Sequence, residues 1–191
     1  MYGLYYQWGR PTPFRTKKLP TAIANKAATP EDAVKNPTIM YGKGSNDWLA
    51  TTNNSLWGYQ NDFTKVQKTI YDPCPQGYML ADRRVWESVA IYQAEEGGWQ
   101  DNGLGAKIEI SGNTIWYPIQ GYIGADGKAN TAINKVRMWS SVVDINKTNN
   151  PFELQYNSSS SADATPSEYR NVALPVRCVS GHSAEAVTNL S

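Results

Sequence analysis

Two cysteines, Cys74 and Cys178, constrain the fold of this chain of 191 residues more than any other feature. Their spacing fits no zinc-binding pattern and no CxxC redox motif. As a disulfide, the pair would close a loop of about 100 residues, which stabilises a fold by about 4–5 kcal/mol in the chain-entropy model. The alternative is two buried free thiols in a cytosolic protein. We favour the disulfide, because the loop-rich second half of the chain would gain from a covalent tie, and a disulfide implies an oxidising compartment.

Composition limits the classes of function. The net charge is +1, from 18 basic and 17 acidic residues, so no basic field attracts a nucleic-acid backbone. No apolar run is long enough to span a bilayer, and the N-terminus has no apolar signal segment. We therefore expect no nucleic-acid partner and no membrane insertion of this domain. We expect the chain to be part of a longer protein that carries the export signal or lipoprotein anchor.

Two helices are expected from capping signals and periodicity. The first follows the sequence TPEDAVKNP, in which Thr29 can cap the helix, Pro30 takes its first position and Pro37 ends it. The second is predicted over 82–96, where apolar residues recur on one face. That face consists of Trp86, Val89, Ala90 and Ala94. The rest of the N-terminal part, to about residue 71, is expected to be irregular.

The second half of the chain is expected to form short strands. Candidate strands cover 107–110, 114–119, 136–143, 152–156 and 173–179. The first two flank the turn sequence SGN and predict a hairpin, and the next two predict a second strand pair. The polar segments 145–151 and 157–171 lack apolar periodicity and are expected to be exposed loops.

Residues with catalytic or metal-binding chemistry are sparse. The sole histidine, His182, lies past the last predicted strand, where a base held in a pocket is not expected. The acidic residues are scattered and nominate no glycosidase pair. The Asp and Asn residues of GADGKAN and SNDW lack EF-hand spacing, and no phosphate-binding glycine motif is present. The sequence therefore predicts no enzyme, no metal site and no cofactor.

An ordered series of motifs resembles a known family. The stretch DPCPQGYMLADRRVWE, at 72–87, resembles the signature CP-x-G-aromatic-x-x-P-x-x-x-x-W of the major paralogous domain family of Fibrobacter. It also resembles the C-terminal domains of fimbrillin-like surface proteins of Bacteroidetes. The other matching motifs, in the same order, are YYQWGRPTPF, DWL, SLWG, KTIY, WYPIQGYI, MWSS and VRCV. One departure is Ala81, where the family has proline.

The resemblance implies a variant of the C-type lectin fold. In that fold Cys74 would pair with Cys178, and the last strand would lie beside 68–71. Trp86 and Trp139 match core positions of the family. The calcium-lectin signatures Glu-Pro-Asn and Trp-Asn-Asp are absent from the sequence, so the resemblance does not extend to calcium-dependent sugar binding.

The expected fold class is accordingly α+β, with small antiparallel sheets, one or two main helices and long loops. We expect a single C-type lectin-like domain over 1–191. Its predicted parts are an irregular N-terminal segment over 1–68, a core over 69–180 and a tail over 181–191.

The resemblance also implies a function: a non-enzymatic, adhesin-like module on the outer surface of a bacterial cell, which binds a glycan or a surface protein through loops of its second half. Those loops are rich in Asn, Ser, Thr and Tyr, which is typical of adaptable binding loops and equally of ordinary loops. The residues expected to contact the ligand are Asn146, Thr148, Asn149, Asn150, Gln155, Asn157, Tyr169, Arg170 and Asn171. Trp99 and Tyr122 are candidate aromatic platforms.

Three alternatives stay open at this point. The first is a structural pilus or fimbrial subunit, whose terminal segments would contact neighbouring subunits by strand addition. The second is a variable protein of a diversity-generating retroelement, because the loop composition is similar to that of the changeable residues in such proteins. The third is an enzyme of glycan or sulfatase-maturation type, which requires a pocket with convergent polar groups.

Overall fold

The computed structural model describes residues 3–15, 18–58, 67–96, 104–110, 112–131, 134–146, 149–157 and 162–180. These residues form two helices and thirteen short strands in five small sheets, four of them antiparallel. The helices are α1 (Pro30–Lys35) and α2 (Arg83–Glu96). The strands are β1 (Leu4–Gln7), β2 (Phe14–Arg15), β3 (Ala22–Ala24), β4 (Ile39–Tyr41), β5 (Tyr78–Leu80), β6 (Gly105–Ile110), β7 (Asn113–Pro118), β8 (Tyr122–Ile123), β9 (Ala129–Asn130), β10 (Lys135–Val143), β11 (Pro151–Asn157), β12 (Ala173–Leu174) and β13 (Cys178–Ser180). The predicted α+β class is confirmed.

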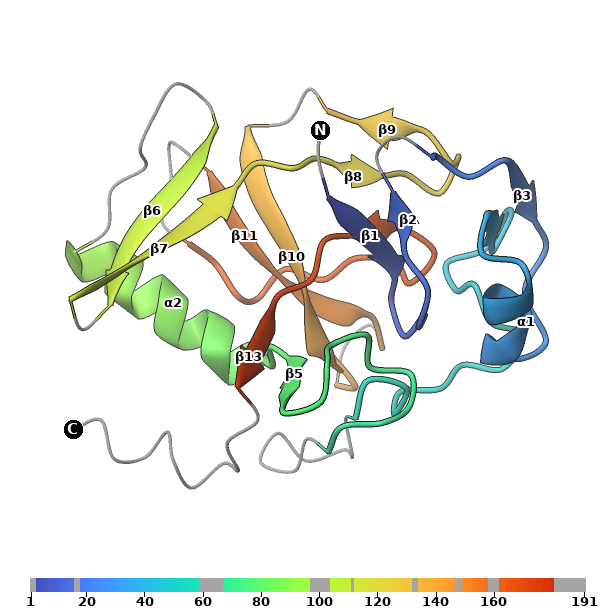
Figure 1. Ribbon diagram of the computed structural model, residues 1–191, viewed down its shortest axis with the longest axis horizontal. Coiled ribbons are helices and arrows are strands. Elements are labelled where there is room, and N and C mark those ends of the chain that lie inside the picture. The colour runs from blue at the N-terminus through green and yellow to red at the C-terminus, as the bar shows by residue number, and fades with distance from the viewer. Residues whose placement is uncertain are drawn as a thin grey trace.

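Both predicted helices are present, at opposite ends of the molecule (Figure 1). At the start of α1, the Asp32 carboxylate accepts the backbone N–H groups of Ala28 and Thr29, each at 3.0 Å. Helix α2 buries Trp86 and Val89 in a core cluster that includes the β6–β7 hairpin. The apolar residues whose spacing predicted this helix therefore include those that pack against the β6–β7 hairpin.

The largest sheet has five strands in the order β2-β1-β12-β8-β9, with antiparallel neighbours. Tyr6 of β1 lies opposite Leu174 of β12, so the two ends of the described chain pair directly. The expectation of an irregular N-terminal part is wrong at β1 and at the short strands β2, β3 and β4. The clearest case is β1. Its residues Tyr5, Tyr6 and Gln7 are all buried, and a strand buried on both faces lacks the alternation of polar and apolar residues that marks a half-exposed strand.

Buried indole rings connect the segments of the core through their N–H groups. Trp86 donates to the carbonyl of Trp139 at 3.2 Å, and Trp139 donates to the carbonyl of Tyr6 at 2.7 Å. Trp48 donates to the carbonyl of Trp8 at 2.7 Å. A buried indole N–H without a partner is costly, so these bonds fix the register of segments that are distant in sequence. The assignment of Trp86 and Trp139 to packing is confirmed.

The last predicted strand, 173–179, is divided between two sheets. β12 belongs to the five-stranded sheet, whereas β13 pairs with β5, and Pro175 lies in the gap between them. Proline has no N–H for a ladder, and the carbonyl of Pro175 instead accepts the N–H of Trp139 at 3.0 Å. The expected pairing of this strand with 68–71 is also wrong, because that segment turns, with the N–H of Asp72 bonded to the carbonyl of Thr69.

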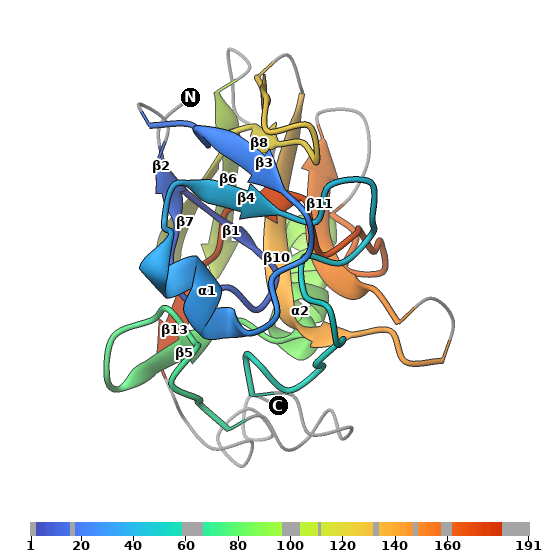
Figure 2. The same cartoon turned by 90° about the vertical axis from the view of Figure 1, so that its right-hand side faces the viewer.

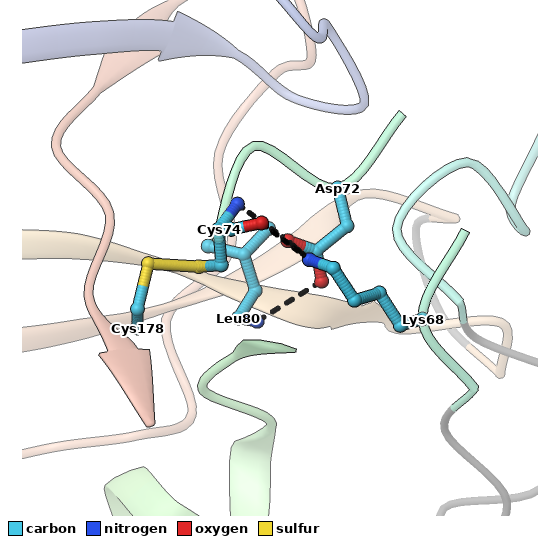
Figure 3. Close-up of a disulfide and its surroundings, with 5 residues drawn as sticks. All are labelled: Lys68, Asp72, Cys74, Leu80 and Cys178. Atoms are coloured by element: carbon cyan, nitrogen blue, oxygen red, sulfur yellow. Dashed lines mark hydrogen bonds and ion pairs between the residues drawn. A yellow bond between two sulfur atoms is a disulfide. The ribbon is translucent and has the colours of Figure 1, made fainter. Parts of the chain in front are cut away.

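The disulfide between Cys74 and Cys178 is present, with the two Cα atoms 5.7 Å apart (Figure 3). The buried Asp72 carboxylate organises its surroundings by accepting the N–H groups of Cys74 at 2.8 Å and Leu80 at 3.2 Å. Lys68 forms an ion pair with Asp72 at 2.9 Å and donates to the carbonyl of Cys74 at 2.6 Å. The predicted covalent tie is confirmed, and it indicates an oxidising, non-cytoplasmic location.

Candidate functional site

A polar pocket of about 560 Å³ lies beside α1. Figure 2 turns α1 toward the reader. Three segments distant in sequence form its walls: the turn into α1, the segment 49–55, and Asn149 from the loop between β10 and β11. The residues that line it are Ala28, Thr29, Pro30, Glu31, Leu49, Thr51, Thr52, Asn53, Asn54, Ser55 and Asn149. Amide and hydroxyl side chains predominate, with one carboxylate, so the pocket suits a ligand held by hydrogen bonds.

Backbone hydrogen bonds fix the first two walls against each other. The N–H of Ala27 donates to the carbonyl of Trp48, and the N–H of Ala50 donates to the carbonyl of Ala27, both at 2.8 Å. The buried Asp47 carboxylate then accepts the N–H of Leu49 at 3.1 Å and the hydroxyl of Thr52 at 2.8 Å. These bonds hold the pocket wall in one conformation before any ligand arrives.

Arg170, one of the predicted ligand contacts, does not line the pocket. It contacts two of the pocket walls, the segment 49–55 and Asn149. Its Nη2 donates to Oδ1 of Asn54 at 2.6 Å and to the carbonyl of Asn149 at 2.8 Å. Nδ2 of Asn54 in turn donates to Oδ1 of Asn149 at 2.8 Å. Because a guanidinium can only donate, this chain fixes the orientation of both amides, and the Nδ2 group of Asn149 is left for a ligand.

Arg170 is itself buried, with 3% of its surface exposed. Its guanidinium carbon lies 4.6 Å from the centroid of the Trp8 ring, and its Nε lies 3.8 Å from Oδ2 of Asp47. Burial lowers the pKa of Arg170 to about 10, although the negative charge of Asp47 acts in the other direction and raises it. The guanidinium therefore stays protonated at neutral pH and acts as a fixed donor.

The one charged lining residue is Glu31, on the first turn of α1. Oε1 of Glu31 accepts the hydroxyl of Tyr71 at 2.7 Å. This bond, with further hydrogen bonds from the Glu31 N–H and the Thr29 side chain, lowers the pKa of Glu31, and the same bond raises the pKa of Tyr71. The pocket therefore carries a negative charge at neutral pH.

The other predicted contacts on the β10–β11 loop and beyond it lie in different surroundings. Asn146 is exposed and its N–H donates to Asp144, while the carbonyl of Asn150 accepts the N–H of Asp144 at 2.8 Å at the base of the loop. Tyr169 is 46% exposed. Thr148 and Trp99 lie outside the described residues, as does the side chain of Asn157.

Asn171 is part of the interior. It is 3% exposed, and its Nδ2 donates to the carbonyls of Gly42 and Ser45. The expectation that Arg170 and Asn171 are exposed loop residues is therefore wrong. Both side chains hold the N-terminal loops in place, a role that a polar composition does not distinguish from ligand contact.

Gln155 and Tyr122 belong to a separate cluster on the β10–β11 ribbon. There Arg137 donates from Nε and Nη2 to the two oxygens of Glu153, at 2.7 and 2.6 Å, and from Nη2 to Glu168 at 3.0 Å. Gln155 donates to Glu153, and the guanidinium of Arg137 lies over the Tyr122 ring. Burial alone would lower the pKa of Arg137, but its bonds to the two carboxylates outweigh burial and raise it. These groups satisfy one another and form a structural network.

Sequence reasoning missed most of the pocket, namely 28–31 and 49–55. The signal was present in the run TTNNS at 51–55, whose composition matches that of the second-half loops. Among the described residues, no three His, Cys, Asp or Glu side chains are grouped to hold a metal ion. Within that same part of the chain, no helix is both long enough and apolar enough to cross a membrane.

The chain was compared with protein-family models, with curated proteins and with solved structures, and no match was found in any of the three. The function of the chain is therefore inferred from the geometry of the pocket and of the hydrogen bonds around Arg170.

Proposed function

We propose that this chain is a non-enzymatic, adhesin-like binding module of a bacterial outer cell surface, which takes a glycan or a surface protein in the pocket beside α1. The observation that carries the proposal is the chain of hydrogen bonds from Arg170 through Asn54 to Asn149. These bonds join Asn149, on the β10–β11 loop where ligand contacts were predicted, to the segment 49–55, which lines the pocket with amide and hydroxyl groups. Fixed polar groups around a pocket lower the ordering cost of binding.

A C-type lectin-like arrangement is part of this proposal. Three features support it: the pairing of β1 with β12, the disulfide that ties 74 to 178, and the long connections between short strands. The disulfide also supports export, since such bonds persist in oxidising surroundings. The motif series shared with fimbrillin-like surface proteins supports display at the cell surface.

A binding screen with matched variants tests the proposal. The purified chain would be applied to a glycan array and to immobilised cell-surface proteins, and each ligand found would be measured again with Asn149→Ala and Asn54→Ala. Asn146→Ala and Tyr169→Ala serve as controls, because these exposed residues do not line the pocket. We expect the pocket variants to weaken binding by about three- to tenfold, the effect of one lost hydrogen bond, and the controls to retain it.

Equal binding by the pocket variants and the parent chain would contradict the proposal. If, in addition, deletion of 181–191 abolished polymer formation, a structural pilus subunit would replace the binding module as the better account.

A further inference from the structure

We infer that the pocket beside α1 selects a neutral pyranose sugar without calcium, through donors from Asn53 and Asn149 and an acceptor from Glu31. This inference rests on the proposed function and adds the class of ligand. Besides Asn149, it uses Glu31 and Asn53 from the first half of the chain, where no ligand contact was predicted.

Two side-chain amides present donors of fixed orientation. Oδ1 of Asn53 accepts the N–H of Ser55 at 2.9 Å, and Oδ1 of Asn149 accepts Nδ2 of Asn54 at 2.8 Å. The oxygen of each amide is engaged, and the Nδ2 groups of Asn53 and Asn149 have no hydrogen-bond partner among the described residues. Two positioned NH2 groups suit the oxygens of neighbouring sugar hydroxyls.

Glu31 supplies the complementary acceptor. Its Oε1 already accepts the Tyr71 hydroxyl, which holds the carboxylate in place. A carboxylate has about four lone-pair sites. Tyr71, the Glu31 N–H and the Thr29 side chain already donate to this one, so Glu31 keeps capacity for one ligand hydroxyl, and hydrogen bonds to an ionised acceptor are the stronger kind. Amide donors and a carboxylate acceptor in one lining match hydroxyl groups, which both donate and accept.

The negative charge of Glu31 disfavours acidic sugars in this pocket. Glu31 is the one charged residue of the lining, and Arg170, which contacts Asn54 and Asn149, has the Asp47 carboxylate at 3.8 Å. Lys35, one turn further along α1, acts on the charge of Glu31 but does not line the pocket. An anionic ligand would therefore meet the negative Glu31 first, and like charges at close range repel. The pocket therefore favours neutral over acidic sugars.

The lining residues do not form a calcium site, so the ligand would be bound without the metal. Calcium takes six to eight oxygen ligands, usually with several carboxylates, whereas the lining offers one carboxylate. Apolar contact for the C–H face of a sugar comes from Ala28, Pro30 and Leu49. A peptide that binds by strand addition needs a sheet edge, and none of the lining residues belongs to a strand of the five sheets.

The test is an NMR titration of the whole oxidised chain, labelled with 15N. The probes are the methyl glycosides of glucose, galactose, mannose and N-acetylglucosamine, with methyl glucuronide as the acidic counterpart. We expect at least one neutral glycoside to shift the side-chain NH2 signals of Asn53 and Asn149 with a Kd of about 1–10 mM, as for a small ligand without aromatic stacking. The shifts should persist in EDTA, and methyl glucuronide should bind at least about tenfold more weakly.

The variant Glu31→Gln keeps the size of the side chain and its acceptor for Tyr71. We expect it to bind the neutral glycoside more weakly and to lose the discrimination against methyl glucuronide. The inference is overturned if no neutral glycoside shifts these signals at about 50 mM, well above the expected Kd. Tighter binding of the glucuronide, or loss of binding in EDTA, would overturn it equally.

These outcomes separate the inference from the proposed function. If a protein or an acidic glycan from the screen binds the parent chain but not Asn149→Ala, the sugar class is wrong and the binding module stands. If Asn149→Ala binds every ligand as the parent chain does, the proposed function fails as well.

Discussion

Arg170 and Asn54 lie 116 positions apart in the sequence, yet Nη2 of Arg170 is 2.6 Å from Oδ1 of Asn54. This bond attaches the N-terminal pocket loop to the segment just before β12. Its strength follows from the charge and the burial of the donor, because a charged donor that is largely shielded from water forms a stronger hydrogen bond than an exposed one.

The Arg170→Lys variant tests that attachment. A lysine ammonium lacks the planar guanidinium that stacks on Trp8 and that donates to Asn54 and Asn149 together. We expect the free energy of unfolding, measured by urea denaturation, to fall by about 2–3 kcal/mol, the cost of losing hydrogen bonds to a buried charge. Lys128→Ala, at an exposed ion pair, is the control and should change it by less than about 0.5 kcal/mol. Equal effects would show that the buried cation does not anchor the loop.

Asn149 has a positive φ of 55°, the left-handed region that favours glycine and asparagine. Asn149→Gly should therefore unfold with nearly the parent free energy, and Asn149→Ala should be less stable than Asn149→Gly by about 1 kcal/mol. Both variants should lose the contact with Asn54, so both should bind ligand more weakly. If alanine and glycine proved equally stable in thermal and urea unfolding, the backbone conformation at 149 would be different from the one described.

Trp139→Phe separates the role of the indole N–H from that of the ring. The variant keeps most of the buried apolar area, but the carbonyl of Tyr6 loses its 2.7 Å donor. We expect a loss of about 2–4 kcal/mol in the free energy of unfolding, from the unsatisfied carbonyl and the smaller ring together. The matched change Trp116→Phe, at a ring that is 43% exposed, should cost less than about 1 kcal/mol. Similar losses at both positions would argue against the indole bond as a core constraint.

Removing the disulfide through Cys74→Ala and Cys178→Ala together should destabilise the chain. The tie closes a loop of about 100 residues, and the chain-entropy model gives about 4–5 kcal/mol for that length. Guanidinium denaturation of the double variant measures the loss, and the reduced parent chain is a second comparison. An unchanged denaturation midpoint in both samples would mean that the hydrogen bonds around Asp72 suffice to hold β13 against β5.

The Glu31–Tyr71 bond predicts a pH dependence. Because this bond lowers the pKa of Glu31 in the folded chain, it contributes stability above the pKa of the unfolded glutamate, and that contribution is lost as the pH falls through the folded pKa. In Tyr71→Phe, the pKa of Glu31 should rise toward the ordinary value of about 4.3, as followed by NMR titration of its side chain. The stability difference between parent and variant should shrink with acidification. A difference that grew below that pH would contradict the assigned bond.

Local signals in the sequence predicted local structure well. The caps around Thr29 and Pro30, the apolar face with Trp86 and Val89, and the turn between β6 and β7 are all properties of a few adjacent residues. The disulfide was predicted because only two cysteines exist and because the motif series indicated their pairing.

Structure that depends on distant contacts was harder to predict. Strand β1 is buried on both faces and shows no alternation. Arg170 and Asn171 have the composition of a surface loop, and only the tertiary fold brings Gly42, Ser45 and Asn54 to them. The pocket likewise exists only after 28–31, 49–55 and Asn149 have come together.

The division of the C-terminal segment at Pro175 has a consequence for how the molecule opens. One short peptide, 173–180, supplies a strand to the five-stranded sheet and, a few residues later, the strand that carries Cys178. Only a few residues of backbone join β12 to β13, so separating one of these strands from its sheet also strains the pairing of the other. Unfolding of one of the two sheets alone is therefore disfavoured. We therefore expect the two sheets to unfold together, so that the disulfide at β13 also restrains β12 and the strand β1 that pairs with it.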